Sequence, residues 1–188
     1  MRIAIHQPEH FPYMGFFEKM KSVDLFVILD DVQYVKGNWH NRNRFINTNG
    51  DWEYFGVQVE KEAYKKHICD VKIVQGVWKK KVLKKIKQNF SIDATEIYES
   101  DYLSTVNMNS IRWGMSKLKI HTPLLWSSAL NINSSNTQRI IDICKRMDAT
   151  TYVSGPGAKD YLQEDLFTDI KLEYTNNNIK DLQSIIAI

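Results

Sequence analysis

Residues 1–31 read MRIAIHQPEHFPYMGFFEKMKSVDLFVILDD, and the class of fold follows from the order of segments in this stretch. Residues 2–6 and 24–29 are short apolar runs, typical of strands that are buried on both faces of a parallel sheet. Residues 16–22 favour a helix between them. Strand, helix and strand form a βαβ unit, whose two strands run parallel. The stretch therefore predicts an α/β fold with a Rossmann-like, mostly parallel sheet covered by helices.

The rest of the chain alternates between strand-like and helix-like segments. Asn49-Gly50 lies between two β-type segments within residues 44–59 and indicates a hairpin. Ser135 and Gln138 have the spacing of a capping box at the start of a helix. No repeat or low-complexity tract interrupts the order, so we expect a single domain over residues 1–188 with the hairpin as an insertion. The remaining periodic segments predict helices at 77–90, 108–118 and 135–147, and strands at 124–128 and 151–154.

Composition and charge narrow the class of protein. The chain has 188 residues, of which 43% are apolar and 25% charged, so a disordered or fibrous chain is excluded. A net charge of +3 is too small to indicate nucleic acid binding by itself. Cys69 and Cys144 lie far apart, outside any CxxC spacing, which argues against a disulfide scaffold and against a zinc site. No segment has the length of a signal peptide core or a membrane span, so we expect a soluble, cytoplasmic protein.

A first polar cluster, residues 6–10 (HQPEH), follows the first strand. Ligands of open α/β sheets bind beyond the carboxyl ends of the strands, so this cluster is a candidate site. His6 and His10 are candidate general bases near neutral pH, and Gln7 and Tyr13 are candidate substrate ligands. The alternative is structural: His6 is hydrogen-bonded to backbone at a strand end, and His10 is simply exposed.

A second cluster begins where the next strand ends. Asp30 and Asp31 follow it directly, and carboxylates in such a place bind a metal, a sugar hydroxyl or an amine. The segment 39–44 (WHNRNR) offers guanidinium and amide donors that suit phosphate oxygens. Internal ion pairing between these arginines and aspartates is the alternative. The candidate ligands in this segment are Trp39, His40, Asn41, Arg42, Asn43 and Arg44.

A third cluster, residues 154–161 (SGPGAKDY), follows the strand predicted at 151–154. A glycine turn between a strand and a helix lets backbone N–H groups approach an anion. The turn matches neither GxxxxGK[ST] nor GxGxxG, so as a bare turn it is a weak signal. Its candidate ligands are Ser154, Gly155, Gly157, Asp160 and Tyr161.

Two further features have ordinary explanations. Six lysines between residues 79 and 87 fill one face of a predicted helix, and such a face is most often solvated; the alternative is a field that steers an anionic substrate. Cys69 lies in the strand-like segment 67–71, where a thiol usually behaves as a small apolar side chain rather than a nucleophile. These basic and aromatic residues lack the signatures of RNA-binding modules, so nucleic acid is not an expected partner.

Several of these segments together resemble the WbqC-like family of bacteria. Residues 6–19 have the pattern His-Gln-Pro-x-x-x-Pro-x-x-Gly-x-Phe-x-Lys, and residues 24–34, 41–44 and 152–162 extend the likeness over most of the chain. His10 departs from the family pattern, which usually has Asn or Ser there, and the segment 182–188 departs from its usual C-terminal helix. His6 is therefore the better candidate for a catalytic role.

The resemblance implies a place in the synthesis of O-antigen and other surface polysaccharides. It suggests N-acyl or aminoacyl transfer to a nucleotide-linked amino sugar, which makes that sugar and an acyl donor the expected partners. In this interpretation His6, or His10, takes the amine proton, and Asp30 or Asp31 positions the sugar. Residues 39–44 and 154–157 hold the diphosphate and the donor. The alternatives are an ATP-dependent activating enzyme related to nucleotidylyl transferases and a non-catalytic sugar-nucleotide-binding protein; the cofactor, any metal requirement and the oligomeric state stay open.

Overall fold

The computed structural model describes residues 1–175 and 183–188, which divide into two compact units. The sheet unit contains Met1–Gln7, Gly15–Leu29 and residues 120–175, and the hairpin unit contains Pro8–Met14, Asp30–Lys119 and residues 183–188. The strands and helices are, in chain order, β1 (Arg2–His6), α1 (Met14–Lys21), β2 (Leu25–Ile28), β3 (Arg42–Ile46), β4 (Trp52–Gly56), α2 (Trp78–Phe90), α3 (Leu103–Leu118), β5 (Leu124–Trp126), α4 (Asn136–Arg146), β6 (Thr151–Ser154) and β7 (Lys171–Tyr174).

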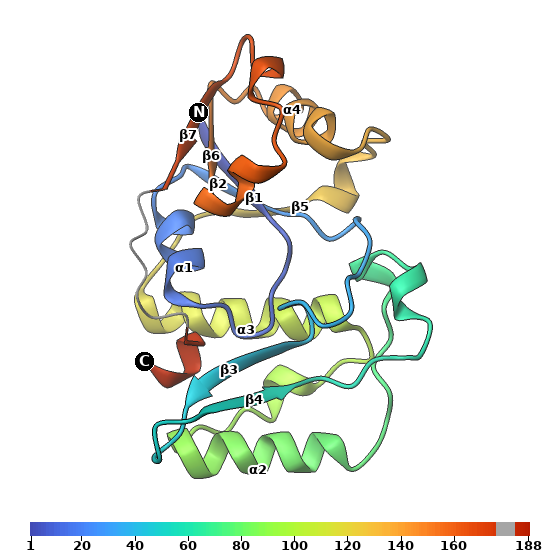
Figure 1. Ribbon diagram of the computed structural model, residues 1–188, viewed down its shortest axis with the longest axis vertical. Coiled ribbons are helices and arrows are strands. Elements are labelled where there is room, and N and C mark those ends of the chain that lie inside the picture. The colour runs from blue at the N-terminus through green and yellow to red at the C-terminus, as the bar shows by residue number, and fades with distance from the viewer. Residues whose placement is uncertain (176–182) are drawn as a thin grey trace. The chain divides into compact units, whose positions relative to one another are not determined.

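The described part of the sheet unit holds a five-stranded sheet in the order β5-β2-β1-β6-β7, and every neighbouring pair is parallel (Figure 1). The chain first builds outward from β1 through β2 to β5. It then returns to the other side of β1 and adds β6 and β7. This is the order of the Rossmann fold, in which the direction of building reverses beside the first strand. The predicted α/β fold with a parallel sheet and an inserted hairpin is confirmed.

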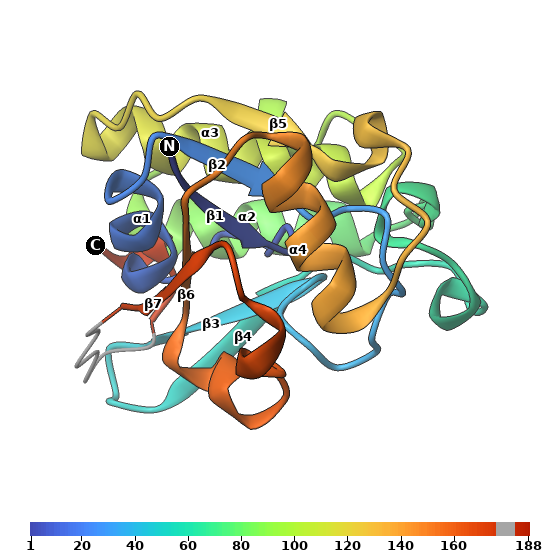
Figure 2. The same ribbon diagram turned by 90° about the horizontal axis from the view of Figure 1, so that it is seen from above.

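Alternation along the strands divides the side chains between the two faces of this sheet. Ile3, Ile5 and Val27 point to one face, where they form a core with the apolar stripe of α4. Phe26 points to the opposite face and packs against Phe16 of α1, with 5.0 Å between the ring centres. Figure 2 shows α1 and α4 on opposite sides of the strands. The sheet is therefore covered by helices on both faces, as continuous apolar strands require.

The hairpin unit is built around β3 and β4, which pair antiparallel across a turn that contains Gly50. Gly50 has a φ of +87°, a conformation that favours glycine and agrees with the predicted turn. Phe45 and Phe55 are buried on one face of the hairpin. In Figure 1 the hairpin runs alongside α2. One face of α2 is rich in lysine, and Trp78, Val82 and Ile86 on its other face are buried.

Most of the predicted elements form close to their expected bounds, with three corrections. Ser135 is the N-cap residue of α4, but its side chain makes no capping hydrogen bond, and Gln138 donates to Asp142 instead, so the capping box is wrong. Residues Ile68–Asp70 form a 3₁₀ turn and not the strand-like segment that their apolar residues suggested. The strand β7 is an addition to the predicted elements, because the alternation of polar and apolar residues in Lys171–Tyr174 extends over only four residues.

Candidate functional site

The carboxyl ends of β1 and β6 form the candidate site of the sheet unit. The last pair of the β1–β6 ladder is Ala4 with Val153, so His6 ends β1 and Gly155 follows β6 at the same edge of the sheet. His6 and Gln7 of the first polar cluster therefore belong to the same unit as the third cluster, whereas Pro8, Glu9 and His10 belong to the hairpin unit. The strand order reverses at β1 and β6, and the carboxyl ends of the strands at such a point are the ligand-binding position in open α/β sheets.

His6 has a defined orientation at this edge. Its Nδ1 lies 3.0 Å from the Gln7 carbonyl oxygen, and since a carbonyl only accepts, Nδ1–H is the donor. The neutral imidazole therefore carries its lone pair on Nε2. The ring is half-buried and packs edge-on against Phe16, with 5.0 Å between ring centres. These contacts present Nε2 as the basic nitrogen of an imidazole whose position is fixed.

Ser154 lies on the other face of the sheet. Because it lies two residues after Tyr152, which packs in the core with α4, its side chain shares the α4 face, whereas His6 packs against Phe16 of α1. Ser154 is buried, and its hydroxyl donates to the Tyr152 hydroxyl oxygen at 3.3 Å. The two polar residues end neighbouring strands, but their side chains do not lie on one wall.

The glycine turn after β6 supplies fewer donors than its sequence suggested. Residues Pro156–Asp160 form only a short 3₁₀ helix, Pro156 has no N–H, and the N–H of Ala158 donates to the Gly155 carbonyl. A Cβ added at Gly155 or Gly157 would meet no atom of the protein within 4 Å. Packing in the described structure therefore does not require glycine at either position. Asp160 and Tyr161, the last two candidates of this cluster, are exposed.

The second cluster belongs to the hairpin unit. Asp30 is buried, and its carbonyl accepts a hydrogen bond from the Cys69 N–H at 2.9 Å, while Asp31 is half-buried. Burial of the Cys69 thiol raises its pKa to about 11, and the negative charges of Asp70, Asp30 and Asp31 act in the same direction. Cys69 is therefore a neutral thiol at physiological pH, in agreement with the prediction that it behaves as a small apolar side chain and not as a nucleophile.

Asn43 connects segments of the hairpin unit. Its side-chain amide is buried and donates to the carbonyls of His10 (3.2 Å) and Phe11 (2.8 Å), while its oxygen accepts from the Arg44 N–H at 2.8 Å. All three contacts are internal. Asn43 thus fastens the loop at residues 8–14 to β3, a role that its place in the Asn-Arg-Asn-Arg segment did not suggest.

The two remaining histidines among the candidates are also buried. His10, expected to be exposed if structural, lies instead beside Phe11, Phe55 and Tyr98, with its Nε2 2.9 Å from the Tyr98 hydroxyl. Burial lowers the pKa of His10 to about 3, outweighing the opposite effect of the Asn107 side chain. His40 accepts a hydrogen bond from the Val35 N–H at its Nδ1, and burial lowers its pKa to about 4. Both imidazoles are neutral at pH 7.

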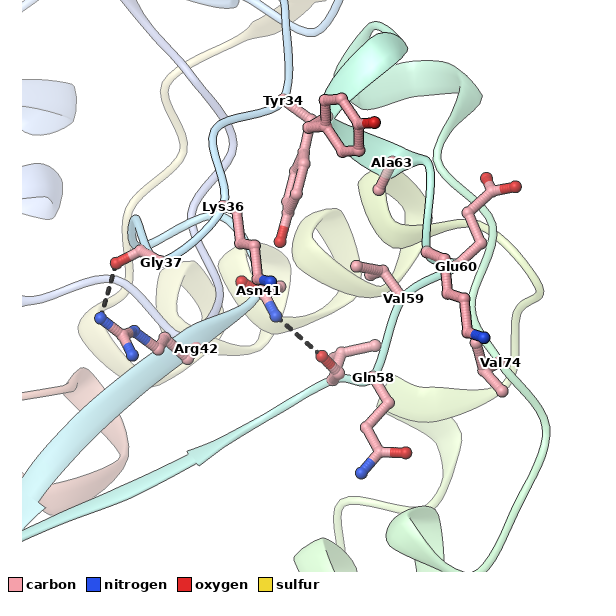
Figure 3. Close-up of a pocket in the computed structure, with 13 residues that line it drawn as sticks. Tyr34, Lys36, Gly37, Asn41, Arg42, Gln58, Val59, Glu60, Ala63 and Val74 are labelled. Atoms are coloured by element: carbon pink, nitrogen blue, oxygen red, sulfur yellow. Dashed lines mark hydrogen bonds between the residues drawn. The ribbon is translucent and has the colours of Figure 1, made fainter.

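A cavity of about 460 Å³ lies within the hairpin unit, lined by side chains from β3 and from the loops on either side of the hairpin (Figure 3). Asn41 and Arg42, predicted as ligands, belong to its wall. The Asn41 amide donates to the Val57 carbonyl at 2.9 Å, and the Arg42 guanidinium donates to the Gly37 carbonyl at 2.6 Å. Lining residues that the sequence does not single out as candidates include Lys36, Gln58, Lys61 and Tyr64.

The cavity is electropositive. Lys36, Arg42 and Lys61 contribute three cations, and Glu60 contributes a carboxylate. Both oxygens of Glu60 accept from the Lys66 ammonium at 2.8 Å, and a backbone N–H of Lys72 adds a third bond, which together lower the pKa of Glu60. Because Lys66 already neutralises Glu60, the three lining cations are left to act on a ligand.

Arg44 points to the face of the hairpin opposite Phe45 and is half-buried. Its guanidinium carbon is 4.0 Å from the centre of the Trp52 ring and 5.6 Å from that of Trp39. These two cation–π contacts restrict the position of the guanidinium. Tyr13, the last candidate of the first cluster, is half-buried, and its backbone forms a bridge with Ser184.

The parallel sheet with this strand order, and polar residues at the point of reversal, define an α/β protein of Rossmann-like architecture. Comparison with known proteins gives its family: residues 7–183 match the model of the WbqC-like protein family, and the chain belongs to that family. It is 30% identical over 187 residues to the "Uncharacterized protein Rv1507c" of Mycobacterium tuberculosis, an alignment that covers 93% of this chain and 80% of the relative. No solved structure matches the chain.

Two features are absent from the described residues. No helix in residues 1–175 and 183–188 has the length and apolar character needed to cross a membrane. In the same ranges, no three His, Cys, Asp or Glu side chains gather in a way that would hold a metal ion.

Proposed function

We propose that the protein is a transferase of surface-polysaccharide synthesis that moves an acyl or aminoacyl group to the amine of a nucleotide-linked amino sugar. The observation that carries the proposal is the position of His6 at the carboxyl end of β1, beside the reversal of strand order. Family membership supports the setting of the reaction.

The chemical step needs a base because an attacking amine gains a positive charge. The amine nitrogen forms a bond to the acyl carbon, the bond from that carbon to the donor's leaving group breaks, and a proton leaves the nitrogen. In the proposal His6 Nε2 takes this proton, since Nδ1–H donates to the Gln7 carbonyl. A positioned base of this kind contributes about 10²–10⁴ in rate.

The other candidate residues take roles that their environments permit. His10 is fully buried and held by Tyr98, so we assign the base to His6 alone. In the sheet unit, the turn at 154–157 is the proposed donor-binding segment. In the hairpin unit, taken by itself, Asp31 is half-buried and is the better of the two aspartates for binding a sugar or its ammonium group, and Arg42 and Arg44 are the proposed donors to a diphosphate.

The experiment is a mass-spectrometric screen of nucleotide-linked amino sugars against acyl and aminoacyl donors. With an active pair in hand, His6→Gln lowers turnover by about 10²–10⁴-fold while the affinity for the nucleotide-linked sugar stays unchanged. His121→Gln is the matched control, because His121 is an exposed imidazole of the same unit. Wild-type turnover in His6→Gln contradicts the role of His6.

The same screen separates the alternatives. Nucleotidylyl transferases use a second histidine where this chain has Phe16, which is buried against His6 and Phe26. This packing leaves no second imidazole at that position, which favours the acyl-transfer proposal. Release of pyrophosphate from ATP in the presence of a carboxylic acid would support the activating enzyme instead, and saturable binding without any product would support a non-catalytic protein.

A further inference from the structure

We infer that the cavity of the hairpin unit is a binding site for a nucleoside diphosphate, with Lys36, Arg42 and Lys61 on the phosphates. The inference takes the ligand in the cell, a nucleotide-linked sugar, from the proposed function. The chemistry of recognition comes from the cavity alone.

The charge of the cavity favours a diphosphate over a carboxylate. Three cations line the wall, and the one lining carboxylate, Glu60, is already bound by Lys66 and by the Lys72 N–H. A carboxylate ligand carries a single charge and would leave most of this positive potential unmatched. A diphosphate carries several charges and many acceptor oxygens, which suit a guanidinium and two flexible ammonium groups.

The three cations differ in how firmly they are held. Arg42 donates to the Gly37 carbonyl and lies 5.2 Å from the centre of the Tyr54 ring, so its guanidinium is fixed at one end of the cavity (Figure 3). Lys36 and Lys61 make no ion pair within residues 1–175 and 183–188. The site therefore offers one preorganised donor and two ammonium groups that can move onto a ligand.

The remaining wall suits the nucleoside part of the ligand. Tyr64 brings an exposed aromatic ring and Val59 adds an apolar surface, whereas Tyr34 belongs to the wall as a buried side chain. Aromatic rings accept a base by stacking, with little dependence on which base it is. The amides of Asn41 and Gln58 are of the type that hydrogen-bonds base edges. A volume of about 460 Å³ lies within the ordinary range of small-molecule sites.

The test is calorimetric titration of the full chain with uridine 5′-diphosphate and adenosine 5′-diphosphate, each compared with its nucleoside and with inorganic pyrophosphate. We expect at least one diphosphate to bind at least tenfold more tightly than its nucleoside and than pyrophosphate. Lys36→Gln and Lys61→Gln each weaken this binding by about tenfold. Lys84→Gln, an exposed lysine of α2 outside the cavity, removes the same charge and leaves the affinity unchanged.

Four outcomes overturn the inference: failure of both diphosphates to bind at millimolar concentration, pyrophosphate that binds as tightly as the nucleotide, nucleoside that does so, or cavity variants that match Lys84→Gln. The inference and the proposed function fail separately. Loss of turnover in His6→Gln with nucleotide affinity insensitive to Lys36 and Lys61 refutes only the cavity. Nucleotide affinity that depends on both lysines, with full turnover in His6→Gln, refutes only the role of His6.

Discussion

The sheet unit and the hairpin unit use clusters of polar residues in opposite ways. In the sheet unit, His6 ends β1 and Gly155 follows β6, and a Cβ at Gly155 or Gly157 in the turn after β6 would meet no atom within 4 Å. In the hairpin unit, Asn43, Asn107 and other buried polar side chains hold the backbone of residues 8–12. A polar cluster at the end of a strand is therefore a candidate ligand site in the sheet unit, whereas in the hairpin unit such a cluster holds the backbone in place by hydrogen bonds.

In the hairpin unit, several of these hydrogen bonds are made to the backbone of Phe11, a buried residue with a φ of +45°. Its N–H donates to the Ser110 hydroxyl oxygen at 3.0 Å, and its carbonyl accepts from the Asn43 amide and from the Ser184 hydroxyl, both at 2.8 Å. A non-glycine residue in this region of φ is strained, and the surrounding bonds determine its conformation. The polar residues here carry stability, so substituting them tests folding before it tests function.

The largest expected difference between the units is in their response to acid. The pKa values of His10 and His40, about 3 and about 4 when folded, lie below the ordinary 6.5. Between these values the unfolded chain binds a proton that the folded chain does not, so unfolding becomes more favourable as pH falls. Each histidine removes up to ~1.4 kcal/mol of stability per pH unit below about 6.5. Denaturant titrations at pH 7 and pH 5, followed by tryptophan fluorescence, measure this slope.

Fluorescence suits this measurement because four of the five tryptophans, Trp39, Trp52, Trp78 and Trp113, belong to the hairpin unit. His40→Gln removes one titrating group and is expected to halve the slope between pH 6.5 and pH 5, a window chosen above the ordinary pKa range of carboxyl groups. The exposed His121→Gln leaves the slope as it is in the wild type. Equal slopes in all three proteins would contradict the burial argument.

Asn43→Ala is expected to have the next largest effect. It removes the donor to the buried His10 carbonyl, one of the two donors to Phe11 and the acceptor for the Arg44 N–H. Leaving buried polar groups without these bonds costs ~3 kcal/mol of the free energy of unfolding. Thermal and denaturant melting check this value against Asn133→Ala, which alters an exposed asparagine of the sheet unit. A melting temperature equal to that of the control would show that Asn43 is free for a ligand.

A pair of glycines sharpens the comparison further. A Cβ at Gly56 of β4 would lie 2.8 Å from the Arg42 Cα and closer still to the Asn41 carbonyl oxygen, whereas a Cβ at Gly155 meets nothing within 4 Å. Gly56→Ala should therefore cost ~2 kcal/mol through overpacking, and Gly155→Ala should leave stability unchanged. If a ligand approaches the turn after β6 closely, Gly155→Ala weakens its binding without altering the melting temperature. Destabilisation by Gly155→Ala would mean that its role is structural.

The sequence predicted those parts of the molecule that depend on local pattern. Continuous apolar runs predict β1 and β2 to within one residue at each end, and Asn49-Gly50 predicts the hairpin, because both signals lie within a few residues. The cavity could not be predicted, since its wall combines Lys36 with Gln58 and Lys61, and non-local bridges such as Val59 with Ile73 shape the loops around it. The role of Asn43 was equally hidden, because residue type does not reveal on which face of a hairpin a side chain points.

The smallest expected effect concerns Arg44, which is half-buried and lies on the same strand as Asn43. Its stacking on Trp52 should contribute ~1 kcal/mol, measured as the coupling energy between Arg44→Met and Trp52→Leu in a double-mutant cycle of unfolding free energies. Arg112→Met replaces Arg44→Met in the control cycle, because Arg112 is an exposed arginine of α3 for which no stacking on Trp52 is found among the described residues. Coupling near zero in both cycles would mean that the indoles do not hold the guanidinium. Coupling confined to Arg44 would mean that Trp52 holds this half-buried guanidinium in place by a cation–π contact, whereas Asn43 beside it is held by hydrogen bonds.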